Sequence, residues 1–376
     1  MKKLLIATDN FLPRWDGVSR FLSEIVPQLE SLFDITIMSP KFKGDLKGWE
    51  NRKLKRFDMT RIKVGDIVLA WPNHDEMKKL VADADIVWVQ TLGPIGGFAV
   101  LQARKLNKPV VTFVHSVEWE LFSKGVKWFK PFVYIFAKFY ARWLYGKCQL
   151  MMVPSLETEE LYTYNGIMTP KKVVHLGIDT EKFRPAENKM EAKRKVGINP
   201  EHYVIGYTGR IAREKDIMTL YRAFMKLRKE RQDVMLILVG DGIEPYMKML
   251  SADEHVILPG SVNNIQEYLQ AMDIFVLPSL TETSSLSTME AMACGVPVVT
   301  TKVGFVKRYV HNKENGLFFP KGNDVVLKIK LIQLLEHESL RKRLGENARK
   351  TITERYMWSS TVERIKAILL SLDSPS

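Results

Sequence analysis

The chain has 376 residues, of which 46% are hydrophobic and 26% are charged, and its formal net charge is +13. This composition excludes a disordered chain, and two cysteines without a Cys-x-x-Cys pair argue against a disulfide scaffold or a structural zinc site. The positive charge favours an anionic partner: a nucleic acid, an anionic membrane surface or a phosphorylated ligand.

Short β-branched runs alternate with longer helical patterns along the whole chain. The first series of predicted strands lies at 3–7, 35–39, 86–90, 110–114, 150–154 and 173–175. A second series lies at 204–207, 235–239, 256–258, 274–277 and 298–300. Several strands are apolar on both faces, as in parallel sheets covered by helices. The alternation predicts an α/β protein with two doubly wound, Rossmann-like sheets.

The chain begins with two lysines and a short apolar run. That run has about five residues, too few for the central part of a signal peptide, so a first strand is predicted there. Longer apolar stretches also fall short of the roughly 18 residues of a membrane-spanning helix.

A domain boundary is predicted near "HLGIDTEKFRPAENKM", where the first strand series ends and Pro185 blocks helix continuation. The N-terminal domain is expected over residues 1–182 and the C-terminal domain over 183–376. The last helix, at about 358–376, is expected to pack back on the N-terminal domain. Such sheets bind ligands at the carboxyl ends of their strands, so two of them are expected to face each other across a cleft.

Two glycine-containing loops follow strands of the second series. In "VIGYTGRIAREKD" (204–216) a strand ends at Gly209, which is followed by Arg210 and then Lys215. Glycine permits close backbone approach to a ligand, and the two cations can neutralise a diphosphate. "LVGDGIEPYM" (238–247) repeats the strand, glycine loop and helix without forming a GxGxxG motif or a P-loop. Each loop alone is also compatible with an ordinary surface turn.

A polar loop separates a strand from a helix in "LPSLTETSSLSTMEAMACGVPVVTT" (277–301). The free N–H groups and the dipole at the start of this helix suit an anion. Glu282 lies in the loop and Glu290 lies well inside the helix, which favours two hydroxyl-binding residues over an acid–base pair. The alternative is a capping role for Glu282 and a solvated helix position for Glu290.

Together these segments resemble the retaining glycosyltransferases of family 4, which have the GT-B architecture. The family carries a Gly-Arg-x4-Lys motif, a Gly-Asp-Gly element and a Glu-x7-Glu motif that ends in "EAMACGxPVV". The chain has "GRIAREK", "VGDG" and "ETSSLSTMEAMACGVPVV" in this order. Further similarity lies in "FLPRWDGVSR", "VVHLGIDTEKFRP" and "NGLFFP", so the resemblance covers nearly the whole chain.

The resemblance implies catalytic roles for Glu282, His115, Arg210 and Lys215. The two cations would hold the donor diphosphate, Glu282 would contact the donor sugar, and Glu290 would bind the ribose. His115 would face the sugar from the N-terminal domain, with a buried structural histidine as the alternative. Further donor contacts are implied for a loop glycine, a base-contacting residue and the phosphate loops: Gly17, Gly209, Val262, Ser285, Leu286 and Ser287.

Two positions depart from the family pattern. Ser285 stands where the family usually has glycine, which could narrow the sugar pocket. The early loop, which includes Gly17, has Asp-Gly in place of the common Gly-Gly, so its conformation does not follow from the family pattern.

The resemblance implies a nucleotide-diphosphate sugar as co-substrate, of the UDP-glucose or GDP-mannose type, and transfer of a hexose with retention of configuration. Arg210, Lys215 and a helix N-terminus can neutralise the leaving phosphate, so no metal or other cofactor is expected. "DAD" at 83–85 is interpreted as the end of a helix and not as a metal-binding pair.

The segment "LFSKGVKWFKPFVYIFAKFYARWLYGK" (121–147) has six Lys or Arg residues, ten aromatic residues and no acidic residue. A basic face beside apolar side chains suits an interfacial helix on anionic lipid. The predicted membrane-facing residues are Lys124, Lys127, Trp128, Lys130, Lys138 and Arg142. The alternative is an ordinary helix with solvated lysines and buried aromatic side chains.

Within the family, His115 followed by such a segment most resembles the diacylglycerol glucosyltransferases and the phosphatidylinositol or lipid mannosyltransferases. This resemblance implies a lipid acceptor, and with the basic segment it predicts a cytoplasmic protein bound peripherally to the inner face of the cell membrane. A soluble sugar or sugar-phosphate acceptor is the alternative for the same chemistry. A non-catalytic nucleic-acid-binding protein would also explain the charge, but the sequence shows no nucleic-acid-binding motif, so no nucleic-acid partner is expected.

Overall fold

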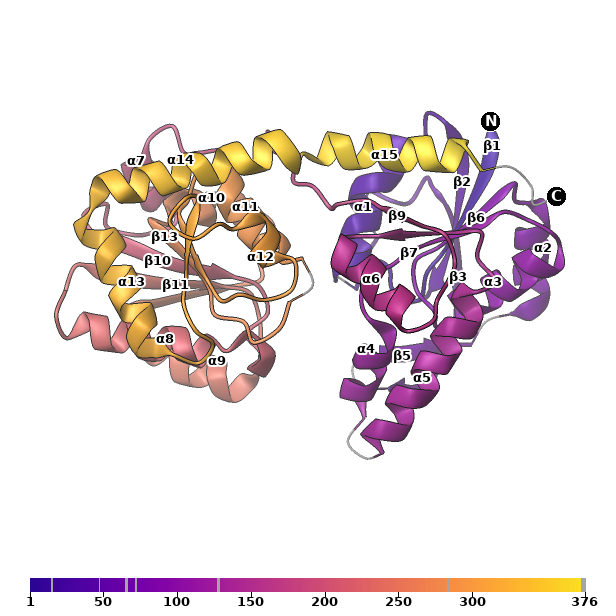
Figure 1. The fold of residues 1–376 in the computed structure, drawn as a ribbon, viewed down its shortest axis with the longest axis horizontal. Helices are drawn as coiled ribbons and strands as arrows, with labels where there is room; N and C mark the ends of the chain where they lie inside the picture. The colour runs from indigo at the N-terminus through magenta and orange to yellow at the C-terminus, as the bar shows by residue number, and fades with distance from the viewer. Residues whose placement is uncertain are drawn as a thin grey trace. The chain divides into compact units, whose positions relative to one another are not determined.

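The computed structural model describes residues 1–14, 16–46, 48–64, 67–71, 73–126, 129–282 and 284–372. The chain divides into two compact units. The first consists of Met1–His175 together with the C-terminal residues from Val362, and the second consists of Leu176–Thr361. In sequence, the second unit is therefore inserted between two parts of the first (Figure 1).

A seven-stranded parallel sheet lies at the centre of the first unit, in the order β3-β2-β1-β6-β7-β8-β9. Its strands are β1 (Lys2–Ala7), β2 (Phe33–Pro40), β3 (Lys53–Phe57), β6 (Ile86–Val89), β7 (Val110–Phe113), β8 (Leu150–Val153) and β9 (Lys171–Val173). A separate antiparallel pair consists of β4 (Met59–Val64) and β5 (Ile67–Ala70). The helices are α1 (Gly17–Leu29), α2 (His74–Asp83), α3 (Pro94–Lys105), α4 (Glu118–Gly125), α5 (Lys130–Tyr145), α6 (Leu156–Tyr164) and, from Val362 onward, the C-terminal α15 (Trp358–Leu370).

The second unit has a six-stranded parallel sheet in the order β12-β11-β10-β13-β14-β15. Its strands are β10 (Tyr203–Thr208), β11 (Val234–Val239), β12 (Val256–Gly260), β13 (Ile274–Leu277), β14 (Val298–Thr300) and β15 (Gly316–Phe318). Its helices are α7 (Lys189–Lys195), α8 (Ile217–Arg228), α9 (Glu244–Leu250), α10 (Ile265–Ala271), α11 (Leu286–Ala293), α12 (Val306–Tyr309), α13 (Asp324–Glu336) and α14 (Glu338–Arg355), with a 3-10 turn at Arg213–Lys215.

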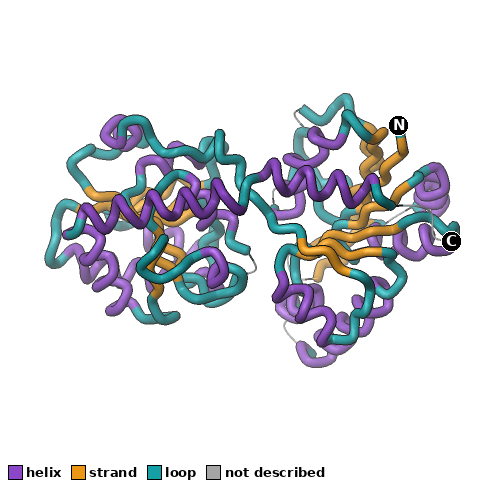
Figure 2. Tube along the Cα trace, turned by 45° about the horizontal axis from the view of Figure 1, so that its top comes forward, coloured by secondary structure: helices purple, strands orange, loops and turns teal. Residues whose placement is uncertain are grey.

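The apolar strands explain the layered arrangement of each unit. All residues of β6 and of β13 are buried, which requires helices on both faces of the sheet (Figure 2). The helices supply one apolar face each: in α8, Leu220, Phe224 and Leu227 recur at helical spacing and are fully buried. The predicted α/β fold with two doubly wound sheets is thus confirmed.

Three strands of the first unit and one of the second lie outside the predicted strands. β3 has alternating exposed and more buried positions at the edge of its sheet, and its sequence "KLKRF" is too basic to be recognised as a strand. The short β15 begins at a glycine, a residue that is depleted in strands. The antiparallel β4–β5 pair belongs to neither parallel sheet, so the pattern of alternating strands and helices gives no indication of it.

The order of strands in the second sheet locates its ligand-binding edge. β10 pairs with β11 on one side and with β13 on the other. The chain first extends the sheet from β10 through β11 to β12, and then crosses to the other side of β10 to form β13, β14 and β15. The switch point of the sheet therefore lies between β10 and β13. In open parallel sheets, ligands bind at the carboxyl ends of the strands beside such a switch point. The loops after β10 and β13 are therefore the first place to look for a site.

Candidate functional site

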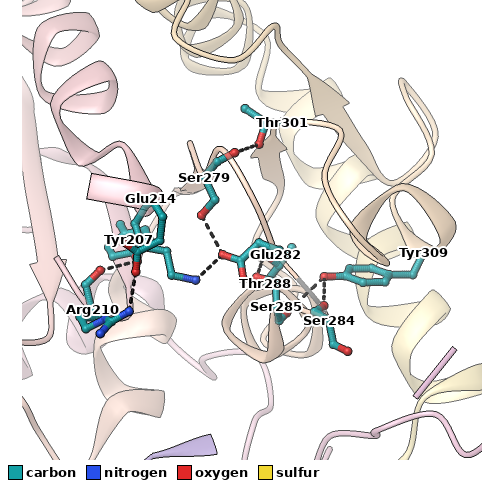
Figure 3. Close-up of polar contacts among 11 residues, drawn as sticks. Tyr207, Arg210, Glu214, Ser279, Glu282, Ser284, Ser285, Thr288, Thr301 and Tyr309 are labelled. Atoms are coloured by element: carbon teal, nitrogen blue, oxygen red, sulfur yellow. Dashed lines mark hydrogen bonds and ion pairs between the residues drawn. The ribbon is translucent and has the colours of Figure 1, made fainter. Parts of the chain in front are cut away.

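The loop after β10 carries two of the predicted cations. Gly209 has a φ of 137°, a conformation that favours glycine. Tyr207 donates a hydrogen bond of 3.0 Å from its hydroxyl to the carbonyl oxygen of Arg210, which fixes the backbone at this residue (Figure 3). The Arg210 side chain forms an ion pair with Glu214 and is largely exposed. Lys215 ends the 3-10 turn.

The loop after β13 brings Glu282 to the loop after β10. Lys215 Nζ lies 2.6 Å from Glu282 Oε1, and Ser279 donates a hydrogen bond of 2.7 Å to the same oxygen. Ser279 is in turn held by Thr301, whose hydroxyl donates to the Ser279 carbonyl at 2.6 Å (Figure 3). The structure therefore places Lys215 and Glu282, which are far apart in sequence, in direct contact at the switch point.

Helix α11 begins directly after Ser285, which is in the left-handed region with φ 53° and ψ 73°. The Ser285 hydroxyl is hydrogen bonded to Thr288 Oγ1 at 2.8 Å and does not cap a first-turn N–H group. The predicted residues Leu286 and Ser287 form the first turn of α11, so the positive end of its dipole lies at this loop. A phosphate can be bound by such a turn together with nearby cations.

The glycine loop after β11 supports the loop after β10. Gly209 N donates to Val239 O, and Gly240 N donates to Gly260 O, both at 2.9 Å. A Cβ on Gly240 would lie 2.2 Å from the carbonyl oxygen of Gly209, so only glycine fits there. The predicted base contact Val262 follows Gly260 by two residues and is partly buried.

Glu290 is buried in α11, with only 1% of its surface exposed. This result contradicts the alternative that Glu290 is a solvated helix residue. It leaves the proposed contact with a ribose as a prediction.

In the first unit, His115 lies two residues after the end of β7. Its Nε2 is 2.9 Å from Oε1 of Gln90, and its ring contacts the rings of Phe21 and Phe113. Burial lowers the pKa of His115 to about 3, so the imidazole is neutral at pH 7. Gly17 is the exposed first residue of α1, and a Cβ on it would meet no atom within 4 Å.

A buried cluster of one glutamate and two tyrosines was not predicted from the sequence. Its glutamate, Glu118, lies three residues after His115. Glu118, the first residue of α4, accepts hydrogen bonds from the hydroxyls of Tyr145 and Tyr162. Burial raises the pKa of Glu118 to about 7. Tyr162 also contacts the Ser116 carbonyl at 3.0 Å, so the cluster connects the segment after His115 to α5 and α6.

Among the described residues, no group of three or more His, Cys, Asp or Glu side chains is placed to hold a metal ion. Asp83 and Asp85 of "DAD" both contact Lys3: Asp83 Oδ1 lies 2.6 Å from its Nζ, and Asp85 accepts from its N–H at 2.7 Å. These contacts agree with a structural role at the end of α2.

The predicted membrane-facing segment corresponds to α4 and α5. Lys130 and Arg142 are exposed and Lys138 is partly buried, whereas Lys127, Trp128 and the side chain of Lys124 lie outside the described residues. Within the described part of the chain, no helix is both long enough and apolar enough to cross a membrane.

The predicted membrane-facing residues include one aromatic residue, Trp128, but none of the aromatic side chains that the structure shows to be exposed. One set recurs at intervals of three and four residues, with exposed fractions between 51% and 75%: Phe129, Phe132, Phe136, Phe139 and Trp143. We call this set the aromatic stripe. Its exposure contradicts the alternative in which the aromatic side chains are buried. The helical spacing alone could have identified the stripe, but it does not tell whether the stripe faces the core or the solvent.

The fold defines a two-domain α/β protein, and the loops after β10 and β13 bring polar and charged side chains together at the switch point of its second sheet. Two family models match the chain: "Glycosyltransferase Family 4" over residues 15–182 and "Glycosyl transferases group 1" over residues 188–351. The chain belongs to this family of glycosyltransferases and has the GT-B fold.

Two relatives and one solved structure of similar fold illustrate the similarity. The chain is 30% identical to N-acetyl-alpha-D-glucosaminyl L-malate synthase of Bacillus anthracis, over 47% of this chain and 48% of that one. It is 25% identical to alpha-monoglucosyldiacylglycerol synthase of Acholeplasma laidlawii, over 91% of this chain and 90% of that one. The crystal structure of Anabaena HepE in complex with UDP has a TM-score of 0.81 and 19% identity, and the match covers 99% of this chain and 100% of that one. The chain spans about half the length of the first curated relatives that it matches.

Proposed function

We propose that the protein transfers a hexose, with retention of anomeric configuration, from a nucleotide-diphosphate sugar to a lipid acceptor at an anionic membrane surface. The donor is of the UDP-glucose or GDP-mannose type. The observation that carries the donor half of this proposal is the contact between Lys215 and Glu282 beside the N-terminus of α11.

The site supplies the charges that transfer from a sugar diphosphate requires. When the bond between the anomeric carbon and the diphosphate oxygen breaks, negative charge develops on the leaving group. Arg210, Lys215 and the first turn of α11 are the groups proposed to stabilise that charge. They can do so without a metal ion, so we propose that transfer is metal-independent.

Retention follows if the acceptor hydroxyl attacks from the side that the diphosphate leaves. The acceptor oxygen bonds to the anomeric carbon, and its proton passes to a phosphate oxygen of the departing nucleoside diphosphate. Glu282 and a neutral His115 then act as groups that orient sugar hydroxyls, not as nucleophiles.

The aromatic stripe supports a lipid acceptor. Exposed aromatic side chains beside Lys130 and Arg142 match an interfacial helix, in which rings enter the lipid and cations remain at the headgroups. The similarity to the Acholeplasma enzyme, named as a diacylglycerol glycolipid synthase, spans most of both chains. Peripheral binding at the inner face of the cell membrane is part of this proposal.

A soluble acceptor is the second candidate, because the Bacillus anthracis relative is named for a malate product. Transfer assays with one nucleotide sugar at a time, offered diacylglycerol in vesicles or a soluble hydroxy acid, separate the two. Donors are chosen first by thermal shift, because a bound donor raises the unfolding temperature. Transfer to the soluble acceptor alone would overturn the lipid half of the proposal and leave the donor half intact.

Membrane binding is tested by sedimentation with phosphatidylglycerol vesicles at low salt. The double variant Phe136→Ser with Phe139→Ser is expected to lose most vesicle binding. Val325 and Ile329 of α13 are 51% and 54% exposed and provide a matched control pair for the same change to serine. Equal binding by both double variants would contradict a role of the aromatic stripe.

A further inference from the structure

The turn that precedes α11 has an unfavourable backbone conformation for its residue. Ser285 has φ 53°, in the region that glycine adopts readily and that a residue with a Cβ adopts at a cost. Such a conformation persists only if surrounding contacts hold it. The contacts around Ser285 therefore show what keeps the first turn of α11 in place.

Tyr309, at the end of α12, provides these contacts. Its hydroxyl lies 2.9 Å from the carbonyl oxygen of Ser284 and 3.2 Å from that of Ser285, so its proton is shared between the two (Figure 3). The side chain of Tyr309 is 0% exposed. Burial raises its pKa well above the ordinary value, so the hydroxyl remains a donor at any assay pH.

Packing fixes the position of this hydroxyl. The ring of Tyr309 lies 5.8 Å from that of Phe305 and 5.9 Å from that of Tyr356, measured between centroids. On the other side of the turn, Thr288 Oγ1 is 2.8 Å from Ser285 Oγ. The carbonyls and the hydroxyl of the turn are thus held by two side chains that are themselves fully buried, Tyr309 and Thr288.

We propose that Tyr309 is a positioning residue for donor binding: its hydroxyl holds the turn at Ser285 in the left-handed conformation that orients the first N–H groups of α11 toward the donor diphosphate. This inference rests on the proposed function of the site. It also gives a role to the serine found where the resembling family has glycine, because a serine needs a hydrogen bond in this turn that a glycine does not.

The test is the donor affinity of Tyr309→Phe, which keeps the ring and removes the hydroxyl. The KM for the nucleotide sugar is expected to rise about tenfold, which corresponds to one lost hydrogen bond, with a smaller change in kcat. Tyr356→Phe removes a hydroxyl from the neighbouring ring and is expected to leave the KM within twofold of the unmodified protein.

Rescue separates positioning from general stability. Because glycine adopts the left-handed conformation unaided, adding Ser285→Gly to Tyr309→Phe is expected to restore the KM to within about threefold of that of Ser285→Gly alone. Equal sensitivity to Tyr309→Phe in the serine and glycine backgrounds would overturn the proposal. So would a Tyr309→Phe variant with an unchanged KM, or a Tyr356→Phe variant with the same rise.

Nucleoside-diphosphate binding by calorimetry distinguishes the two levels of the argument. If the unmodified protein binds UDP or GDP and Tyr309→Phe binds it equally well, the inference fails and the proposed function stands. If the unmodified protein binds neither and transfers no sugar, both fail. If Tyr309→Phe does not fold, Thr288→Val takes its place: it removes the hydrogen bond to Ser285 Oγ and is expected to raise the KM in the serine background only.

Discussion

The ammonium group of Lys215 lies 2.6 Å from Oε1 of Glu282, and the two side chains are 22% and 9% exposed. Lys215 is proposed to bind the donor diphosphate, and Glu282 is proposed to bind the donor sugar. Their contact means that each orients the other, so a change at one position is transmitted to both ends of the bound donor.

We therefore expect Lys215→Ala and Glu282→Ala each to lower kcat/KM by about 10²–10³, a range typical of the loss of one charge-stabilising group. The double variant is expected to lose less than the product of the two single effects, because the residues are in contact. Steady-state transfer assays on the four proteins measure this coupling. Normal activity of Lys215→Ala would refute its assignment to the diphosphate.

Arg210 is expected to contribute separately from this pair. Arg210→Ala removes one of the charges proposed for the leaving phosphate, so kcat should fall by at least about tenfold. Arg222 of α8 is likewise an exposed arginine in an ion pair, with Asp324, and Arg222→Ala serves as the matched control. An equal loss in both variants would indicate an effect of net charge and not of position.

Removal of divalent metal ions is expected to leave transfer unchanged. The proposed charge stabilisation depends on two cations and the first turn of α11, none of which EDTA affects. Activity is compared before and after chelation, with magnesium then added back. A loss that magnesium reverses would contradict metal independence.

Glu118 predicts a measurable dependence of stability on pH. Its pKa in the folded protein, about 7, is raised above the ordinary value of 4.5 by burial. Its contribution to the free energy of unfolding is therefore fully present below about pH 4.5 and is lost as the pH rises through about 7. For this one group the loss between pH 5 and pH 8 is about 2–3 kcal/mol.

The variant Glu118→Gln has no such titration and keeps an acceptor for the two tyrosine hydroxyls. Urea unfolding at pH 5 and pH 8 is expected to show a smaller decrease in stability for the variant than for the unmodified protein. An equal decrease in both proteins would show that the carboxyl of Glu118 ionises in the folded state as readily as in the unfolded chain.

The sequence predicted the sheets and the polar loops because both depend on local pattern. Buried strands such as β6 and β13 are apolar throughout, and Gly209 and Lys215 follow a strand at recognisable spacing. The contact between Lys215 and Glu282 depends on which strands are neighbours, and strand order is not encoded in any local pattern. Tyr309 and Glu118 were missed for a similar reason, since a buried aromatic or acidic residue has no distinctive neighbours in sequence.

For the segment at 121–147, the sequence pattern identifies the residues but not which of them are exposed. The sequence indicates a segment rich in basic and aromatic residues, and most of the residues that it predicts to face the membrane are cations. The structure shows that Phe132, Phe136 and Phe139 are also exposed. Whether an apolar helix face lies inward or outward depends on the helices that pack beside it, which only the folded chain reveals.

The close approach of Gly240 to Gly209 has a consequence for how this protein can vary. The space that a side chain at Gly240 would need is taken by the backbone carbonyl of Gly209, in another loop. Any residue larger than glycine at this position would displace the backbone next to Arg210, so a change in the proposed donor preference is expected at other positions. The backbone of the glycine loops is thus constrained by close packing, and sequence variation is expected in the side chains that these loops carry.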